Sequence, residues 1–126
     1  KNMKKTHCLV VAVFGTVLWS SVTHADNCDQ ARNTYDDIYC TNKVYASADA
    51  ELNKNYQLLR TKLNSNQKAI LKTSQLSWIR DRDNECTTST GVDVGCRLRT
   101  TQERNHWLRE RVRECTTIGC KTSALR

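Results

Sequence analysis

The chain has 126 residues, a formal net charge of +7, seven cysteines and no proline. A chain of this length is expected to make one domain with a modest core. The charge is unevenly placed: residues 26–51 hold two Lys or Arg against six Asp or Glu, whereas residues 97–126 hold eight against three. One end of the sequence is therefore acidic and the other basic.

The first 25 residues have the pattern of a secretory signal peptide. Lys4 and Lys5 precede an apolar run from Leu9 to Trp19, and small residues lead up to Ala25. The run is too short to span a hydrocarbon core about 30 Å thick, so the pattern does not favour a membrane anchor. We expect cleavage after Ala25 and a single exported domain over residues 26–126.

Six cysteines follow the expected cleavage point, an even number that indicates three disulfides in an exported chain. Zinc is the competing use of clustered cysteines, but no CxxC pair occurs and His106 is the only histidine after residue 25. We therefore expect no metal and no cofactor. Sequence proximity favours bonds between neighbouring cysteines. The expected pairs are Cys28–Cys40, Cys86–Cys96 and Cys115–Cys120.

The polar segment after Cys28 is expected to form a turn or two of helix. It cannot be one straight helix if Cys28 pairs with Cys40, because twelve residues would span about 18 Å, whereas bridged Cα atoms lie about 4.4–6.8 Å apart. The chain is predicted to double back near Asn33.

A first long helix is predicted from apolar residues that recur at steps of three and four between Leu52 and Leu63. The pattern extends upstream to about Tyr45. Asp49 and Glu51 would then lie near the start of the helix, where negative charge suits the helix dipole.

A second helix is predicted from Ser65 to about Cys86. Asn64 is a suitable N-cap, and Gln67 supplies the other half of a capping box. Trp78 falls on the apolar stripe of this helix and is expected in the core. The two helices are predicted to form a hairpin against which the rest of the chain packs.

The run between Cys86 and Cys96 is rich in Thr, Ser and Gly and predicts the main loop, residues 87–95. A third helix should follow, with a thin apolar stripe through Leu108 and arginines on its outer surface. Residues 121–126 are expected to be frayed. The sequence therefore predicts an all-α, disulfide-stabilised bundle of about three main helices plus a short amino-terminal helical segment.

Four ordered blocks of residues carry a resemblance to a known family. The blocks are Asp26-Asn27-Cys28 with Cys40, Ala48 to Asn53 with Tyr56, Gln75-x-x-Trp78-Ile79-x-x-Arg82-Asp83-x-x-Cys86, and Cys96 with Thr101-x-x-Arg104 and Leu108. From Cys28 to about Leu108 the chain resembles the secreted bacterial LprI-like lysozyme inhibitors. The resemblance implies a small helical bundle with disulfides, a periplasmic or secreted location, and inhibition of lysozyme. Cys115 and Cys120 look like an addition to the two cysteine pairs of the family.

The polar residues in these blocks also have structural interpretations. Arg82, Asp83 and Arg104 are expected to form an ion-pair network between the second and third helices, with a recognition patch as the alternative. Asn53 is expected to hydrogen-bond across the helix pair. None of these residues indicates chemistry.

No group of residues indicates a hydrolase. The cysteines are expected to be oxidised, and His106 lies among arginines with no evident nucleophile nearby. Asp36 and Asp37 are adjacent, so their side chains diverge on a helix. We therefore expect a binding protein and not an enzyme.

The expected partner, supplied by the resemblance, is a cell-wall hydrolase such as lysozyme. The basic end of the chain would repel a basic lysozyme, so the expected contact surface is the acidic region 26–51, with Asp36 and Asp37. The second candidate surface is the main loop, at Val92, Asp93 and Val94.

The competing interpretation is an envelope-associated protein that holds anionic polymers or lipid head groups on its third helix. The arginines concerned are Arg97, Arg99, Arg109, Arg111 and Arg113. Nucleic acid is not an expected partner of an exported protein, although such a surface binds it weakly at low salt.

Overall fold

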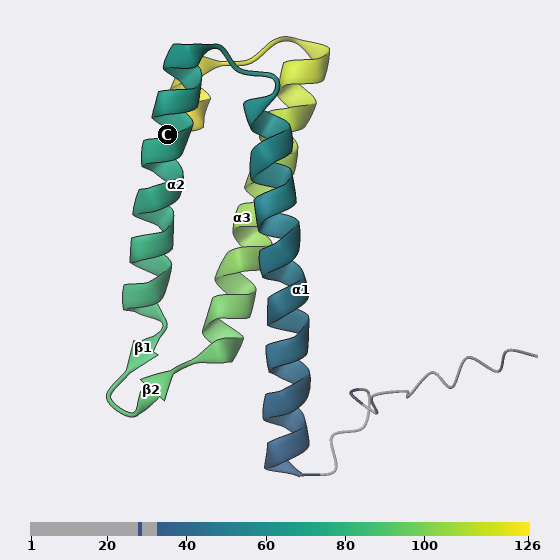
Figure 1. Ribbon diagram of the computed structural model, residues 1–126, viewed down its shortest axis with the longest axis vertical. Coiled ribbons are helices and arrows are strands. Elements are labelled where there is room, and N and C mark those ends of the chain that lie inside the picture. Colours follow the sequence, from purple (N-terminus) through teal and green to yellow (C-terminus); the bar gives the residue numbers. More distant parts are fainter. Residues whose placement is uncertain (1–27, 29–32) are drawn as a thin grey trace, which may run out of the picture.

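Three long helices make up most of the protein (Figure 1). The computed structural model describes residue 28 and residues 33–126, so the predicted signal peptide lies outside the described residues. The elements in chain order are α1 (Thr34–Arg60), α2 (Ser65–Glu85), β1 (Thr87–Thr88), β2 (Gly91–Val92), α3 (Val94–Thr117) and the 3-10 helix η1 (Thr122–Leu125). The predicted all-α, disulfide-stabilised bundle is confirmed. None of the described helices is long and apolar enough to cross a membrane.

Helix α1 begins well before the predicted start near Tyr45. Asn33 is its N-cap, and the Asn33 side-chain oxygen accepts a hydrogen bond from the Asp36 amide at 2.9 Å. The described part of the predicted amino-terminal segment, residues 34–40, is not a separate helix, because it is continuous with α1. Asp36 and Asp37 therefore occupy the first turn, and Asp49 lies in the middle of the helix.

The three predicted disulfides are present. They are Cys28–Cys40, Cys86–Cys96 and Cys115–Cys120, with Cα separations of 5.4, 5.4 and 4.1 Å. Cys40 lies inside α1, whereas Cys28 precedes the Asn33 cap. Cys28 thus lies outside α1, as the short distance between the two bridged Cα atoms requires.

Helix α2 starts as predicted. The Gln67 amide donates to the Asn64 side chain at 2.8 Å, and the Asn64 amide donates to the Gln67 side chain at 3.0 Å. These two bonds satisfy donors that a helix start would otherwise leave free. The helix ends at Glu85, and the Cys86–Cys96 bond joins its C-cap residue, Cys86, to α3.

The main helix pair is α1 with α3, and not α1 with α2 as predicted. Figure 1 shows α2 standing apart from α1, with α3 between them in the view. The buried Asn105 side chain donates to the Ala48 carbonyl at 3.0 Å and accepts from Asn55 at 3.1 Å. The cross-helix bond expected of Asn53 is thus made by Asn55, while Asn53 is exposed.

The core is a cluster of leucines from all three helices and from the end of the chain. Its members are Leu52, Leu59, Leu63, Leu71, Leu108 and Leu125. Leu125 is 1% exposed, so the prediction of a frayed tail was wrong. Gly119 adopts a φ of +100° after α3, and the Cys115–Cys120 bond returns the tail to the core. Trp78 packs only against the edge of this cluster and is half-buried.

The main loop contains a small antiparallel hairpin, in which Thr87 pairs with Val92 and Thr88 with Gly91. Gly91 has a φ of +146°, a conformation that side chains disfavour. The Asp93 amide donates to the Cys86 carbonyl at 2.8 Å beside the disulfide. The loop is therefore an ordered projection between α2 and α3.

Candidate functional site

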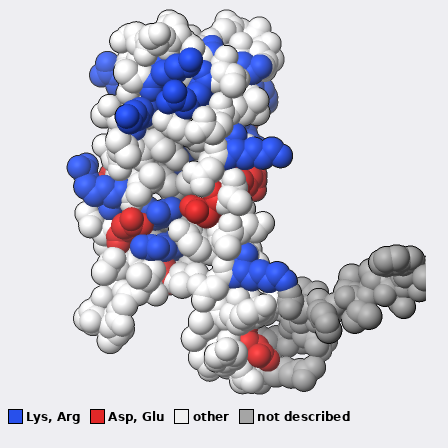
Figure 2. Space-filling model, viewed as in Figure 1, with Lys and Arg blue, Asp and Glu red and all other residues white. Residues whose placement is uncertain are grey.

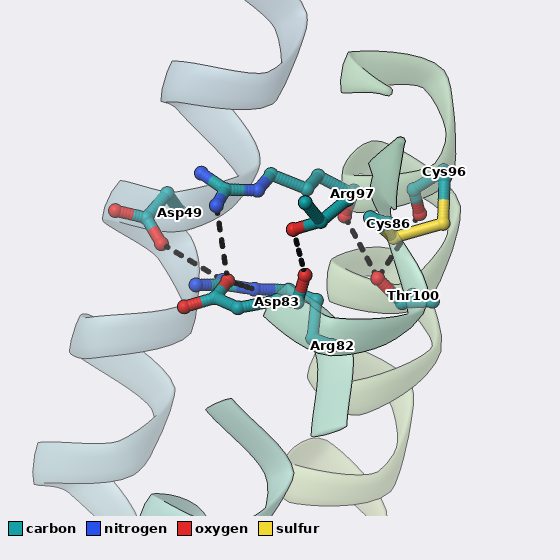
Figure 3. Close-up of polar contacts among 8 residues, drawn as sticks. Asp49, Arg82, Asp83, Cys86, Cys96, Arg97 and Thr100 are labelled. Carbon is teal, nitrogen blue, oxygen red and sulfur yellow. Dashed lines mark hydrogen bonds and ion pairs between the residues drawn. A yellow bond between two sulfur atoms is a disulfide. The ribbon is translucent and has the colours of Figure 1, made fainter. Parts of the chain in front are cut away.

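An ion-pair network joins the three helices close to the Cys86–Cys96 bond (Figure 3). Arg82 from α2 donates through Nε to Asp83 Oδ1 at 3.0 Å, and its Nη1 lies 3.7 Å from Asp49 Oδ1 on α1. Arg97 from α3 contacts the same Asp83 oxygen at 3.2 Å. The predicted network is confirmed for Arg82 and Asp83, and it reaches α1 as well.

Arg104 does not belong to this network, so the prediction that it takes part in the ion pairs was wrong. The side chain is 8% exposed. Its Nε donates to Gln75 Oε1 and its Nη2 to Ser74 Oγ, both at 2.9 Å, and its guanidinium lies 3.8 Å from the ring centre of Trp107. Arg104 makes no ion pair within the described part of the chain, and burial lowers its pKa to about 10. The group is therefore a nearly buried cation at neutral pH.

An open groove of about 700 Å³ lies along α2 beside Arg104. Ile70 and Trp78 give it an apolar wall, and Thr73 and Ser77 add hydroxyl groups. The sequence analysis did not find this groove, because it depends on how far α3 lies from α2. The only available signal was that Trp78 and Arg104 belong to neighbouring blocks of one sequence pattern.

The first turns of α1 expose an apolar stripe. Tyr35, Ile38 and Tyr39 are 77%, 53% and 52% exposed, and their spacing of three and four residues places them on one face. Asp36 and Asp37 lie in the same turns, with Asp37 exposed and Asp36 half-buried. The sequence analysis singled out the two carboxylates but missed the apolar residues beside them.

The hairpin β1–β2 lies at the same end of the bundle as the start of α1 (Figure 1). Val92 is about half exposed on β2. Asp93 is the N-cap of α3 and accepts from the Cys96 amide at 3.0 Å, and Val94 is the half-buried first residue of that helix. Of the three loop residues, Val92 thus offers apolar surface on the projecting hairpin.

Intramolecular carboxylates pair with most of the arginines on α3. The ion pairs are Arg97–Asp83, Arg109–Glu51, Arg111–Glu114 and Arg113–Glu110. Arg99 is exposed and makes no ion pair with a described residue. Asp49 and Glu51 also take part in such pairs. The predicted basic face and the predicted acidic region therefore carry less unpaired charge than their sequences indicate.

A second basic surface, which we call the basic end, lies where α1 ends and α2 begins. Figure 2 shows Lys and Arg gathered over the upper part of the visible face. Residues 60–72 hold four Lys or Arg and no Asp or Glu. The cations of the basic end make no ion pairs within the described ranges; they are Arg60, Lys62, Lys68, Lys72 and Lys121.

These features define a small helical protein, held by disulfides, whose notable surfaces suit binding. Within the described residues, no group of His, Cys, Asp and Glu could hold a metal ion. Residues 25–108 match the family model described as Lysozyme inhibitor LprI, and the chain belongs to this family of lysozyme inhibitors. Searches among curated proteins and among solved structures found no match. The family match ends within α3, so the Cys115–Cys120 bond and η1 lie beyond it.

Proposed function

We propose that the protein is an exported inhibitor that blocks a lysozyme-type cell-wall hydrolase by occlusion, without chemistry of its own. The contact surface would be the first turns of α1. The observation that carries this proposal is the exposed stripe of Tyr35, Ile38 and Tyr39 on a helix end bearing Asp36 and Asp37. Membership of the lysozyme inhibitor family supplies the class of partner.

Several properties of this stripe suit an interface. Aromatic residues are enriched at binding hot spots, and contiguous exposed apolar residues are typical of interaction sites. The Cys28–Cys40 bond fastens the chain to the same region of α1, which reduces the entropy lost on association. The partner would therefore meet a surface that is already ordered.

The charges around the stripe favour a basic partner. Asp36 and Asp37 make no ion pair with a described residue, whereas Asp49 and Glu51 do. Unpaired carboxylates at the rim attract a basic protein and speed its encounter. The basic end lies at the opposite end of α1 and would repel the same partner.

The test is a turbidity assay on bacterial cell walls with lysozyme and increasing amounts of the protein. Replacing Tyr35 and Tyr39 together by alanine should weaken inhibition at least about tenfold, because hot-spot residues each contribute more than about 1 kcal/mol. The matched control replaces Leu76 and Ile118, which are also exposed apolar residues but lie elsewhere. The control should inhibit like the parent. No inhibition of lysozymes of several classes at tenfold excess of the parent would refute the proposed function.

A second candidate function rests on the basic end. The five cations of the basic end, which make no ion pair with a described residue, form a surface that can hold an anionic envelope polymer. Binding to a polyanion column should then fall steeply with salt and weaken when Lys62 and Lys121 are replaced by glutamine. Replacing Arg109 and Arg113, which have carboxylate partners, should change binding less.

A further inference from the structure

We propose that the groove along α2 binds a small saccharide that carries a carboxylate, with Arg104 supplying the opposite charge. This site is separate from the first turns of α1 and does not depend on the inhibitory function. The argument begins with the charge of Arg104 and continues with the shape and lining of the groove.

Two arginines of the protein are equally buried, but they differ in whether a carboxylate lies close enough to balance their charge. Arg82 and Arg104 are each 8% exposed. Arg82 lies within ion-pair distance of Asp49 and Asp83, whereas among the described residues Arg104 contacts neutral polar groups and aromatic rings and makes no ion pair. A buried cation without an opposite charge is unfavourable unless an anion approaches it. Because Arg104 lines the groove, an anion can reach it there.

The lining of the groove suits a sugar ring. Ile70 and Trp78 offer apolar surface on which the C–H face of a ring can pack, and the Trp78 ring centre lies 5.8 Å from the Arg104 guanidinium. Thr73 and Ser77 place hydroxyl groups along the same wall. The volume of about 700 Å³ lies within the range of about 300–1,000 Å³ that small-molecule sites occupy. An apolar wall with hydroxyls and the buried cation of Arg104 thus fits a sugar that carries an acidic group.

The remaining charged side chains that line the groove are those of Asp81 and Arg126. Among the described residues, the ion pair of Asp81 is an exposed contact with Arg80 at 3.8 Å. Its carboxylate would repel a phosphate dianion more strongly than a singly charged carboxylate, and it can accept hydrogen bonds from sugar hydroxyls. A guanidinium also matches the planar geometry of a carboxylate.

The test uses three probes that separate the parts of the ligand. N-Acetylmuramic acid has a sugar ring with a lactyl carboxylate, N-acetylglucosamine has the ring alone, and lactate has the carboxylate alone. Trp78 and Trp107 both lie beside Arg104 and are the tryptophans that remain after residue 25, so their indole N–H resonances report binding. N-Acetylmuramic acid should bind saturably and at least about tenfold more tightly than either of the other probes.

Three results with the parent protein would count against the proposal. One is the absence of saturable shifts with N-acetylmuramic acid up to about 10 mM. Another is equal affinity for all three probes, because the groove would then recognise neither the ring nor its acidic group. Binding of lactate alone as tightly as the complete sugar would likewise refute the saccharide part.

Substitutions locate the site without disturbing the core. Ala69→Trp fills the groove from an exposed position on α2 and should weaken N-acetylmuramic acid binding at least about tenfold. Leu76→Trp places the same indole side chain at an exposed position outside the groove and should bind like the parent. Arg104→Gln should reduce the preference for the acidic sugar to less than about threefold. Unchanged binding by Ala69→Trp would overturn the proposal even if the Arg104 variant fails to fold.

Discussion

Asn105 donates a hydrogen bond to the backbone carbonyl of Ala48 across 3.0 Å and thereby joins the middle of α3 to the middle of α1. Asn105 is 2% exposed, so water cannot replace this bond. Its side-chain oxygen is satisfied as well, by the amide of Asn55. A buried polar side chain with both ends satisfied fixes the relative position of the two helices.

Asn105→Ala should therefore destabilise the protein by about 1–3 kcal/mol. The substitution leaves the Ala48 carbonyl and the Asn55 amide without this partner in a region that excludes water. Urea unfolding followed by circular dichroism measures the change. Asn53→Ala is the matched control, since Asn53 is exposed on the same stretch of α1 and should change stability by less than about 0.5 kcal/mol.

Leu125→Ala should destabilise the protein by about 2–5 kcal/mol, because the side chain is fully enclosed by the leucine cluster. Ile118→Ala is the control, since Ile118 is 78% exposed just after α3. Thermal unfolding of the two variants gives the comparison. Equal melting temperatures would contradict a structural role for the end of the chain.

Trp78→Ala should cost about 1–3 kcal/mol, less than the roughly 3–5 kcal/mol of a fully buried aromatic, because Trp78 is half-buried at the edge of the core. The ring also loses its contact with the Arg82 guanidinium, which lies 5.0 Å from its centre. Chemical unfolding of the variant measures the loss. A cost as large as that of Leu125→Ala would show that Trp78 is a central core residue.

Local signals in the sequence predicted the fold better than long-range ones. The capping box at Asn64 depends on residues three apart, and each disulfide joins cysteine neighbours, so both could be predicted. The first turns of α1 could not, since apolar periodicity detects a buried face and this part of the helix faces solvent at Tyr35 and Ile38. The burial of Leu125 depends on a chain reversal made after α3.

The choice of helix partners and the groove also depend on tertiary structure. The stripe on α3 predicts that the helix is covered, but it does not say whether α1 or α2 covers it. Arg82 and Arg104 look alike in sequence, and only the fold gives carboxylates to one and neutral groups to the other. The sequence could therefore indicate the family and the carboxylates Asp36 and Asp37. It could not indicate that the buried Arg104 would have neutral partners.

The last prediction concerns the charges beside the exposed stripe of α1. Replacing Asp36 and Asp37 by asparagine should slow association with a basic lysozyme and weaken its salt dependence, since charges at an interface rim act mainly on the encounter rate. The fold should survive, because helix-dipole contacts contribute only about 0.3–1 kcal/mol each. The control replaces Glu85 and Glu103 by glutamine, which removes the same net charge at exposed positions elsewhere. Surface plasmon resonance at several salt concentrations gives the rates, and equal slowing by both double variants would show that net charge, and not the first turn of α1, attracts the partner.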